Sequence, residues 1–244
     1  MHIPQIDILH DIFNERITVI NISNNCDILT LEEAKKICSE NNFDVQLVKD
    51  EDSSDVKVYE RIAGVARPLR SSEVISEATP IIEVLELLLK QPYAFIKERR
   101  EITRIVTNAD LDSIPIRIWL FGMISLFEKQ IRIYIQKNDL NWETCLSEDR
   151  LNDAQKLFIM KTKRNEEVDL IDCAQLVDLG SIVKKLSSHY IFEGGSKTKT
   201  EKFFFKLNKL RDELAHTQKL TLSWKVIFDH MNIVHNTLSK HSLE

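Results

Sequence analysis

The stretch ISEATPIIEVLELLLKQPYAFIKERREITRIVTNADLDSIPIR, residues 75–117, decides the fold of the first half of the chain. Residues 81–91 carry apolar side chains at three- and four-residue steps, which is the spacing of one buried helix face. The segment 93–98 reads as a strand, and 103–111 reads as a strand that runs into a polar turn, with a tight turn at 99–102 between the two segments. The stretch therefore predicts a helix followed by a pair of strands.

The preceding part of the chain repeats this order of elements. Thr30 and Glu33 form a capping box at the start of a helical stretch that reaches residue 42. The segments 43–48 and 56–66 read as strands with a turn at Gly64, and the β-branched run 17–20 predicts another short strand. A β–helix–β–β unit of roughly 50 residues thus occurs twice, and an internal repeat of this kind is informative about the fold.

From Ser113 onward the sequence is helical. Ser113 can cap a first helix over 114–138, which is apolar almost all round and should therefore be central. Further helices are predicted over 147–165, 170–189 (bent near Gly180), 200–216 and 223–241. Helices joined by short links are typical of a bundle. The predicted fold class is α+β, with a tandem α/β module over 1–112 (copies at about 8–64 and 65–112) and an all-α bundle over 113–244.

The composition restricts what the protein can be. The net charge of −5 gives no overall basic surface for nucleic acid, so any such contact must be local. No window approaches 18 uninterrupted apolar residues, and the first residues lack the pattern of a signal peptide. The four cysteines are scattered without a Cys-x-x-Cys pair, which favours reduced thiols over disulfides or a zinc site. We therefore expect a cytoplasmic protein with no metal site and no membrane partner.

The repeated unit resembles a pair of CBS domains, the regulatory modules first named from cystathionine β-synthase. The match is strongest in the second copy, with its Thr-Pro start, helix, strand pair and closing Ile-Val-Thr-x-x-Asp-Leu. The sequence has Thr103-Arg104 where the family commonly has a glycine, and the first copy lacks the Thr-x-x-Asp ending. The resemblance implies that Thr107 and Asp110 contact the ribose or phosphate of an adenine nucleotide.

The helical half resembles HEPN domains, α-helical bundles found in ribonucleases of toxin and antiphage systems. The matching signature is Arg-x4-His near the end of a late helix, here Arg211 to His216, with Ala215 before the histidine and Asp212 after the arginine. The resemblance implies RNA cleavage in which the 2′-hydroxyl attacks the adjacent phosphorus, leaving a 2′,3′-cyclic phosphate and a 5′-hydroxyl, without a metal or other cofactor.

These roles suit the residue types. A histidine near its ordinary pKa can move the proton, so His216 would be the general acid or base. The planar fork of Arg211 can hold the phosphate, Asp212 can orient either residue, and Glu128 can reach the same cleft and hold Arg211. Five residues of ideal helix turn through about 500°, which leaves Arg211 and His216 about 140° apart. We therefore expect a homodimer whose two-fold axis brings two motifs into one cleft.

Local charge fits an RNA partner, because residues 196–219 hold seven Lys/Arg against three Asp/Glu. Plainer interpretations of the same residues remain open. A histidine in the last turn suits the helix dipole, Glu128 can pair with Arg132 at i+4, and Thr107 and Asp110 are ordinary turn and cap residues. The alternative function is therefore a non-catalytic sensor of adenine nucleotides, whose bundle serves for dimerisation or partner binding.

Overall fold

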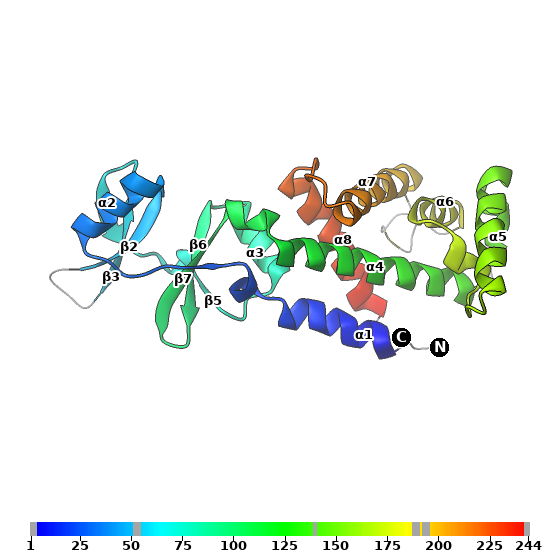
Figure 1. The fold of residues 1–244 in the computed structure, drawn as a ribbon, viewed down its shortest axis with the longest axis horizontal. Coiled ribbons are helices and arrows are strands. Elements are labelled where there is room, and N and C mark those ends of the chain that lie inside the picture. Colours follow the sequence, from blue (N-terminus) through cyan, green and yellow to red (C-terminus); the bar gives the residue numbers. More distant parts are fainter. Residues whose placement is uncertain (1–3, 51–54, 139–140, 187–190, 192–195, 242–244) are drawn as a thin grey trace. The chain divides into compact units, whose positions relative to one another are not determined.

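The computed structural model describes residues 4–50, 55–138, 141–186, 191 and 196–241, and the chain forms two compact units (Figure 1). One unit spans residues 14–116 and contains both β-sheets. The other joins the segment that ends at Phe13 to the residues from Arg117 onward, and it is helical. The α+β class is confirmed, whereas the units differ from the predicted division at 112/113, because the N-terminal segment belongs with the helices.

The second copy of the repeat contains the elements that its sequence predicts. The copy comprises β5 (Val74–Ser76), α3 (Ile81–Leu88), β6 (Tyr93–Glu98) and β7 (Glu101–Thr107). Strand β6 lies parallel to β5 and antiparallel to β7. The turn between β6 and β7 is shorter than predicted, because Arg99 adopts a positive φ of 54° and lets pairing resume at Glu101.

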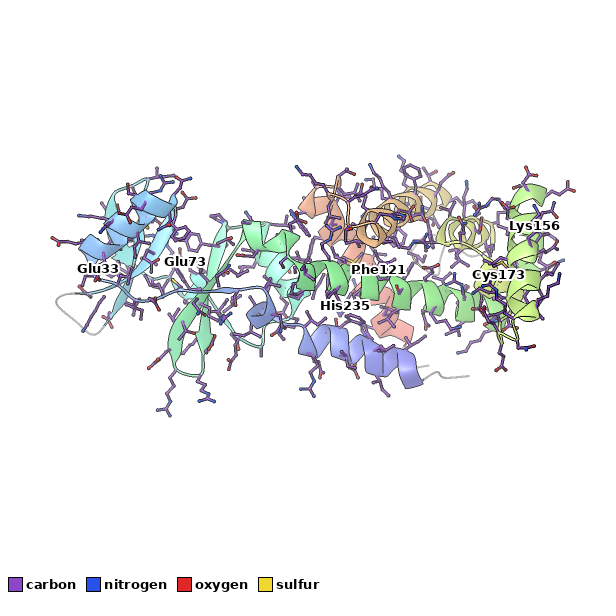
Figure 2. All side chains as sticks on the ribbon, viewed as in Figure 1. Glu33, Glu73, Phe121, Lys156, Cys173 and His235 are labelled. Atoms are coloured by element: carbon purple, nitrogen blue, oxygen red, sulfur yellow. The ribbon has the colours of Figure 1, made fainter. Side chains whose placement is uncertain are left out.

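The first copy has the same connectivity. It comprises α2 (Leu31–Asn41), β2 (Val45–Lys49) and the antiparallel β3 (Val56–Glu60), and a parallel bridge from Leu29 to Val48 takes the place of β5. The capping box of α2, the helix that carries Glu33 (Figure 2), is confirmed. Glu33 N–H donates to Thr30 Oγ1 over 3.3 Å, and Thr30 N–H donates to the Glu33 carboxylate over 3.0 Å. The strand predicted at 17–20 is wrong, because the chain forms the 3-10 turn η2 (Val19–Asn21) there.

The two copies exchange their leading strands. Strand β1 (Asn24–Asn25) belongs to the first copy but pairs with β7 of the second. Strand β4 (Val65–Pro68) opens the second copy but pairs with β3 of the first. Each sheet is therefore completed by the strand that leads into the other copy, which joins the two copies into one unit.

The helical unit is built around α4 (Ile114–Lys137), as predicted. Phe127 of α4 is fully buried, and its ring centroid lies 5.7 Å from that of Phe203 and 5.9 Å from that of Phe204. The surrounding helices are α1 (Pro4–Asp11), α5 (Glu148–Lys163), α6 (Leu176–Leu186), α7 (Lys197–Ala215) and α8 (Trp224–His241). None of the helices in the described ranges is long and apolar enough to cross a membrane.

Helix α6 differs from its prediction over 170–189. A separate 3-10 turn, η6 (Leu170–Cys173), precedes it, so the break falls before Leu176 rather than near Gly180. Residues 187–189 lie outside the described part of the chain. Gly180 instead lets α6 approach α7, because a Cβ built on it would lie 2.6 Å from Cβ of Phe204. The glycine therefore serves close helix packing and not a bend.

Replacing Gly180 by alanine is expected to lower the free energy of unfolding by roughly 1–3 kcal/mol, because the added methyl overpacks the contact with Phe204. Urea unfolding followed by tryptophan fluorescence measures this, since all three tryptophans lie in the helical unit. Ser181→Ala, at the next position of the same helix, is the matched control and should change the value by less than about 0.5 kcal/mol. Equal stability of the two variants would contradict the packing role of Gly180.

Candidate functional site

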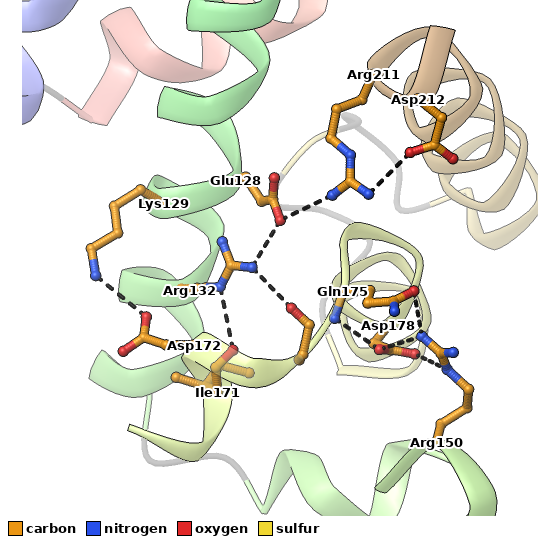
Figure 3. Close-up of polar contacts among 11 residues, drawn as sticks. Glu128, Lys129, Arg132, Arg150, Ile171, Asp172, Gln175, Asp178, Arg211 and Asp212 are labelled. Carbon is orange, nitrogen blue, oxygen red and sulfur yellow. Dashed lines mark hydrogen bonds and ion pairs between the residues drawn. The ribbon is translucent and has the colours of Figure 1, made fainter. Parts of the chain in front are cut away.

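Arg211 lies on α7, and two carboxylates hold its guanidinium group (Figure 3). Its Nη1 lies 3.5 Å from Oε1 of Glu128 on α4, and its Nη2 donates to Oδ1 of Asp212 over 3.1 Å. The Arg211 side chain is 25% exposed, which leaves part of the fork open to solvent. The contact between Glu128 and Arg211 is thus present, 83 residues apart in the chain, while its catalytic role stays a prediction.

Glu128 is shared by two arginines. It also accepts a hydrogen bond from Nη2 of Arg132 over 2.8 Å, so the plainer i+4 pair exists beside the contact with Arg211. Arg132 donates further to the carbonyl oxygens of Ile171 (3.3 Å) and Ala174 (2.9 Å), which ties the turn η6 and the residue after it to α4 (Figure 3). The i+4 pair of Glu128 with Arg132 that the sequence offers is therefore present, and it holds Glu128 beside Arg211.

His216 is the residue at which α7 ends. Its backbone N–H donates to the carbonyl oxygen of Asp212 over 3.1 Å, and its side chain is exposed. Within the described ranges, the imidazole forms no hydrogen bond or ion pair with Arg211, Asp212 or Glu128. The structure therefore brings three of the predicted residues together and leaves the fourth exposed at the end of the same helix.

The exposed part of α7 is basic and carries an aromatic ring. Lys197, Lys199 and Lys202 are exposed in its first two turns, and Lys209 is 47% exposed nearer to Arg211. Phe205 is 70% exposed, although neighbouring Phe203 and Phe204 are buried. Exposed aromatic rings among cations are the elements by which proteins bind single-stranded nucleic acid.

The arrangement around Arg211 limits its chemistry. The charges around the site cancel, because it contains two arginines and two carboxylates (Arg132, Arg211, Glu128 and Asp212). Attraction of a phosphate must therefore come from the lysines of α7. The contacts described for Arg211 engage its two terminal nitrogens, and the fork has five N–H groups in all. A guanidinium fixed in this way can hold one phosphate in a set orientation with little loss of side-chain entropy.

A second candidate site is a cavity of about 780 Å³ in the sheet unit. Both copies of the repeat line it: the first copy contributes residues 24–26 and 42–46, and the second contributes residues 92, 93, 105 and 107–110. The lining contains five amide side chains (Asn24, Asn25, Asn42, Gln46 and Asn108) and no lysine or arginine. The volume and the amide groups suit a small ligand with many hydrogen-bonding groups.

Thr107 and Asp110 both line this cavity and also cap the 3-10 turn η4 (Asn108–Asp112). Asp110 Oδ2 accepts hydrogen bonds from the N–H (2.7 Å) and the hydroxyl (2.8 Å) of Thr107. Asp110 Oδ1 accepts from Asn24 Nδ2 over 2.7 Å. The two predicted binding residues are therefore together, and the exchanged strand β1 supplies a third polar residue, Asn24, that sequence reasoning missed.

The equivalent position in the first copy is closed by ion pairs. Asn24 pairs with Ile105 on β7 as Arg67 pairs with Val58 on β3, so Arg67 is the counterpart of Asn24. Arg67 contacts Glu60 over 2.6 Å and donates to Glu73 and to the hydroxyl of Tyr93. The position that is open beside Thr107 and Asp110 is therefore filled by charged side chains in the first copy.

Arg67 sets the pKa values around it. Burial alone would raise the pKa of Glu73, but hydrogen bonds from Arg67, from the Arg70 N–H and from Tyr93, with the charge of Arg67, lower it to about 2. Burial and the hydrogen bond to Glu73 raise the pKa of Tyr93 to about 12. Glu73 is thus ionised and Tyr93 protonated near neutral pH, which makes this cluster a fixed structural element.

Among the described residues, no group of three or more His, Cys, Asp or Glu side chains could hold a metal ion. Burial raises the pKa of the Cys26 thiol in the cavity wall, so that thiol is poorly nucleophilic. Comparisons of the chain with models of protein families, with curated proteins and with solved structures find no match. Its function must therefore be inferred from the geometry of its own residues and from the motifs described above.

Proposed function

We propose that the chain is a metal-independent endoribonuclease of the toxin or defence type. In this proposal the helical unit is a HEPN-like domain, and the repeat module is a CBS-like pair that regulates or dimerises it. The observation that carries the proposal is the pairing of Arg211 with Glu128 and Asp212, with His216 exposed at the end of the same helix. A fixed cation and a free imidazole on one helix are the groups that phosphodiester transfer requires.

The surroundings of the motif support RNA as the substrate. The exposed lysines of α7 provide charge for the phosphates, and the exposed ring of Phe205 provides a surface for an unstacked base. His216 does not touch Arg211 within one chain, so we propose that two chains form the working site. In that homodimer, the imidazole of one copy would face the guanidinium of the other across a two-fold axis.

Incubation of the purified chain with RNA in EDTA tests the proposal. The expected products carry a 2′,3′-cyclic phosphate and a 5′-hydroxyl, because the 2′-oxygen forms the new bond to phosphorus and the 5′-oxygen leaves with a proton. Labelling the 5′ ends with a kinase and opening the cyclic ends with acid identify both groups. Cleavage that EDTA abolishes, or products with 5′-phosphates, would contradict the proposed chemistry.

The second candidate function is nucleotide sensing without catalysis, and the cavity between the two copies favours it. Its amide-rich lining contains Thr107 and Asp110, the residues that the CBS resemblance assigns to the ligand. Because no lysine or arginine lines it, the nucleoside part would supply most of the binding energy. Calorimetry with adenosine, AMP and ATP distinguishes the ribonuclease from the non-catalytic sensor. Heat of binding with one of these ligands, together with no RNA cleavage in the presence of any of the three, would favour the sensor.

Asp110→Asn is expected to weaken binding of adenosine or AMP about tenfold, because one charged acceptor that can hold a ribose hydroxyl becomes neutral. Calorimetric titration measures the change. Glu33→Gln is the matched control, since Glu33 is also the acidic residue of a capping box but does not line the cavity. Equal affinities of the two variants would exclude Asp110 from the binding site.

A further inference from the structure

The turn that carries His216 has an unusual backbone. Gln218 N–H donates to the carbonyl of Glu213 over 2.9 Å and Thr217 N–H donates to that of Leu214 over 3.3 Å, which together form a Schellman motif. The residue in the left-handed position of this motif is commonly glycine, because it has no Cβ. Here it is Thr217, with a φ of 51°. A β-branched residue rarely adopts this conformation, so surrounding contacts must hold the turn in place.

Two groups from the same unit hold this turn. Arg117 in the first turn of α4 donates through Nη2 to the carbonyl oxygens of Gln218 (2.8 Å) and Glu213 (3.2 Å), which bracket His216 in the chain. The carboxylate of Glu213 is buried and accepts hydrogen bonds from the Thr221 N–H over 3.0 Å and from the Thr221 hydroxyl. The backbone on both sides of the imidazole is therefore fixed, while the imidazole itself is exposed.

We propose that Arg117, Glu213 and Thr221 are positioning residues that hold the strained turn so that His216 meets its phosphodiester in the right orientation. We call these three residues the clasp. The inference rests on the proposed ribonuclease function for the role of His216, but the clasp itself rests only on the contacts above. A buried carboxyl group and an arginine directed at main-chain carbonyls are costly unless the geometry that they fix matters.

The expected kinetic effect is a loss of turnover without loss of substrate binding. Arg117→Met and Thr221→Val should each lower kcat by about 100-fold or somewhat less, while KM changes by less than about threefold, because a misplaced proton-transfer group slows the chemical step. In a His216→Ala background, neither substitution should lower the rate further by more than about twofold, since residues that act through one group are not additive. Full additivity in that background, or a change in KM alone, would overturn the inference.

A spectroscopic measurement keeps the test independent of RNA cleavage. The ring resonance of His216 is identified by its loss in His216→Ala, and it should shift or broaden in Arg117→Met and Thr221→Val. Thr162→Val on α5 is the matched control, because its hydroxyl also donates to a carbonyl but lies elsewhere. If the natural chain fails to cleave RNA, the ribonuclease proposal fails, and this resonance still decides the clasp. A His216 resonance that is unchanged in both clasp variants would overturn it.

Thr217→Gly separates positioning from folding, in case Arg117→Met does not fold. Glycine suits the left-handed position, so the variant should fold at least as stably as the natural chain, yet it frees the turn to move. We expect unchanged or raised stability with a kcat lowered about tenfold. Raised stability with full activity would show that the strained turn has no part in positioning His216.

Discussion

Replacing Arg211 or His216 by alanine is expected to lower the rate of RNA cleavage by at least about 100-fold, the scale on which removal of a general acid–base group or of a transition-state cation acts. The loss should appear in kcat, because the phosphorane charge and the proton transfer exist only in the transition state. Initial rates on a labelled RNA in EDTA measure it. Arg211→Lys should recover little activity, since lysine keeps the charge but loses the fork that Glu128 and Asp212 hold.

Two controls sharpen this prediction. Lys156→Ala on α5 (Figure 2) removes a cation whose side chain is 78% exposed, and it should leave the rate unchanged. Mixing Arg211→Ala with His216→Ala chains tests the dimer, because a site built from two copies regains one intact pair in the mixed dimer. Equal cleavage by the natural chain and both single variants would contradict the proposed site. If the natural chain cleaves RNA but mixing the two variants restores no activity, only the proposal of a cleft shared between two chains is contradicted.

Glu73→Gln is expected to lower the free energy of unfolding at pH 7 by about 3 kcal/mol, since it leaves the charge of Arg67 half-buried without its main partner. The Glu73 side chain is only 8% exposed and accepts hydrogen bonds from Arg67, Tyr93 and the Arg70 N–H. Urea unfolding followed by circular dichroism measures the change. Tryptophan fluorescence serves as a reference, because it reports the helical unit.

The same variant has a defined pH dependence. The pKa of Glu73 is about 2 in the folded chain against an ordinary 4.5, so its ionised form stabilises the fold above about pH 4.5. That contribution is lost as the pH falls toward 2. The difference in the free energy of unfolding between the natural chain and Glu73→Gln should therefore become smaller over this range. Glu86→Gln is the matched control: its pair with Lys90 is exposed and should contribute about 0.5 kcal/mol or less at any pH. A gap that stays constant down to pH 3 would contradict the role assigned to the carboxylate.

Local signals were sufficient for much of the fold. The capping box of Thr30 and Glu33 and the strand 93–98 appear where the sequence places them, because the box closes within three residues and the strand forms a hairpin with the segment that follows it directly. The run 17–20 has strand-forming residues but little to pair with: Thr18 forms a single bridge to Pro80, and Val19 N–H donates to the carbonyl of Thr79. Whether such a segment forms a strand depends on its tertiary partners, which a local window of sequence does not show.

The residues of the candidate sites also fall into those that local sequence identifies and those that only the tertiary structure reveals. Arg211, His216, Thr107 and Asp110 could be named from short motifs, whereas their partners come from distant parts of the chain. Asn24 reaches Asp110 only because β1 crosses to the second sheet, and Arg117 reaches the turn after α7 from 96 residues away. Arginine gives no local pattern that tells a residue of the clasp from ordinary surface charge, so these contacts required the structure.

The exchange of β1 and β4 affects the order in which the two sheets can form while the chain is being synthesised. Strand β4 follows β3 directly, so the first sheet can be completed early, whereas β1 must wait until β7 emerges about 80 residues later. A chain severed at the link between β4 and β5 would keep the first sheet complete but would separate β1 from β7, and the unpaired edge of β7 accepts a strand from another molecule. Two fragments cut at this link should therefore reassemble on mixing, because β1 of one fragment can pair with β7 of the other.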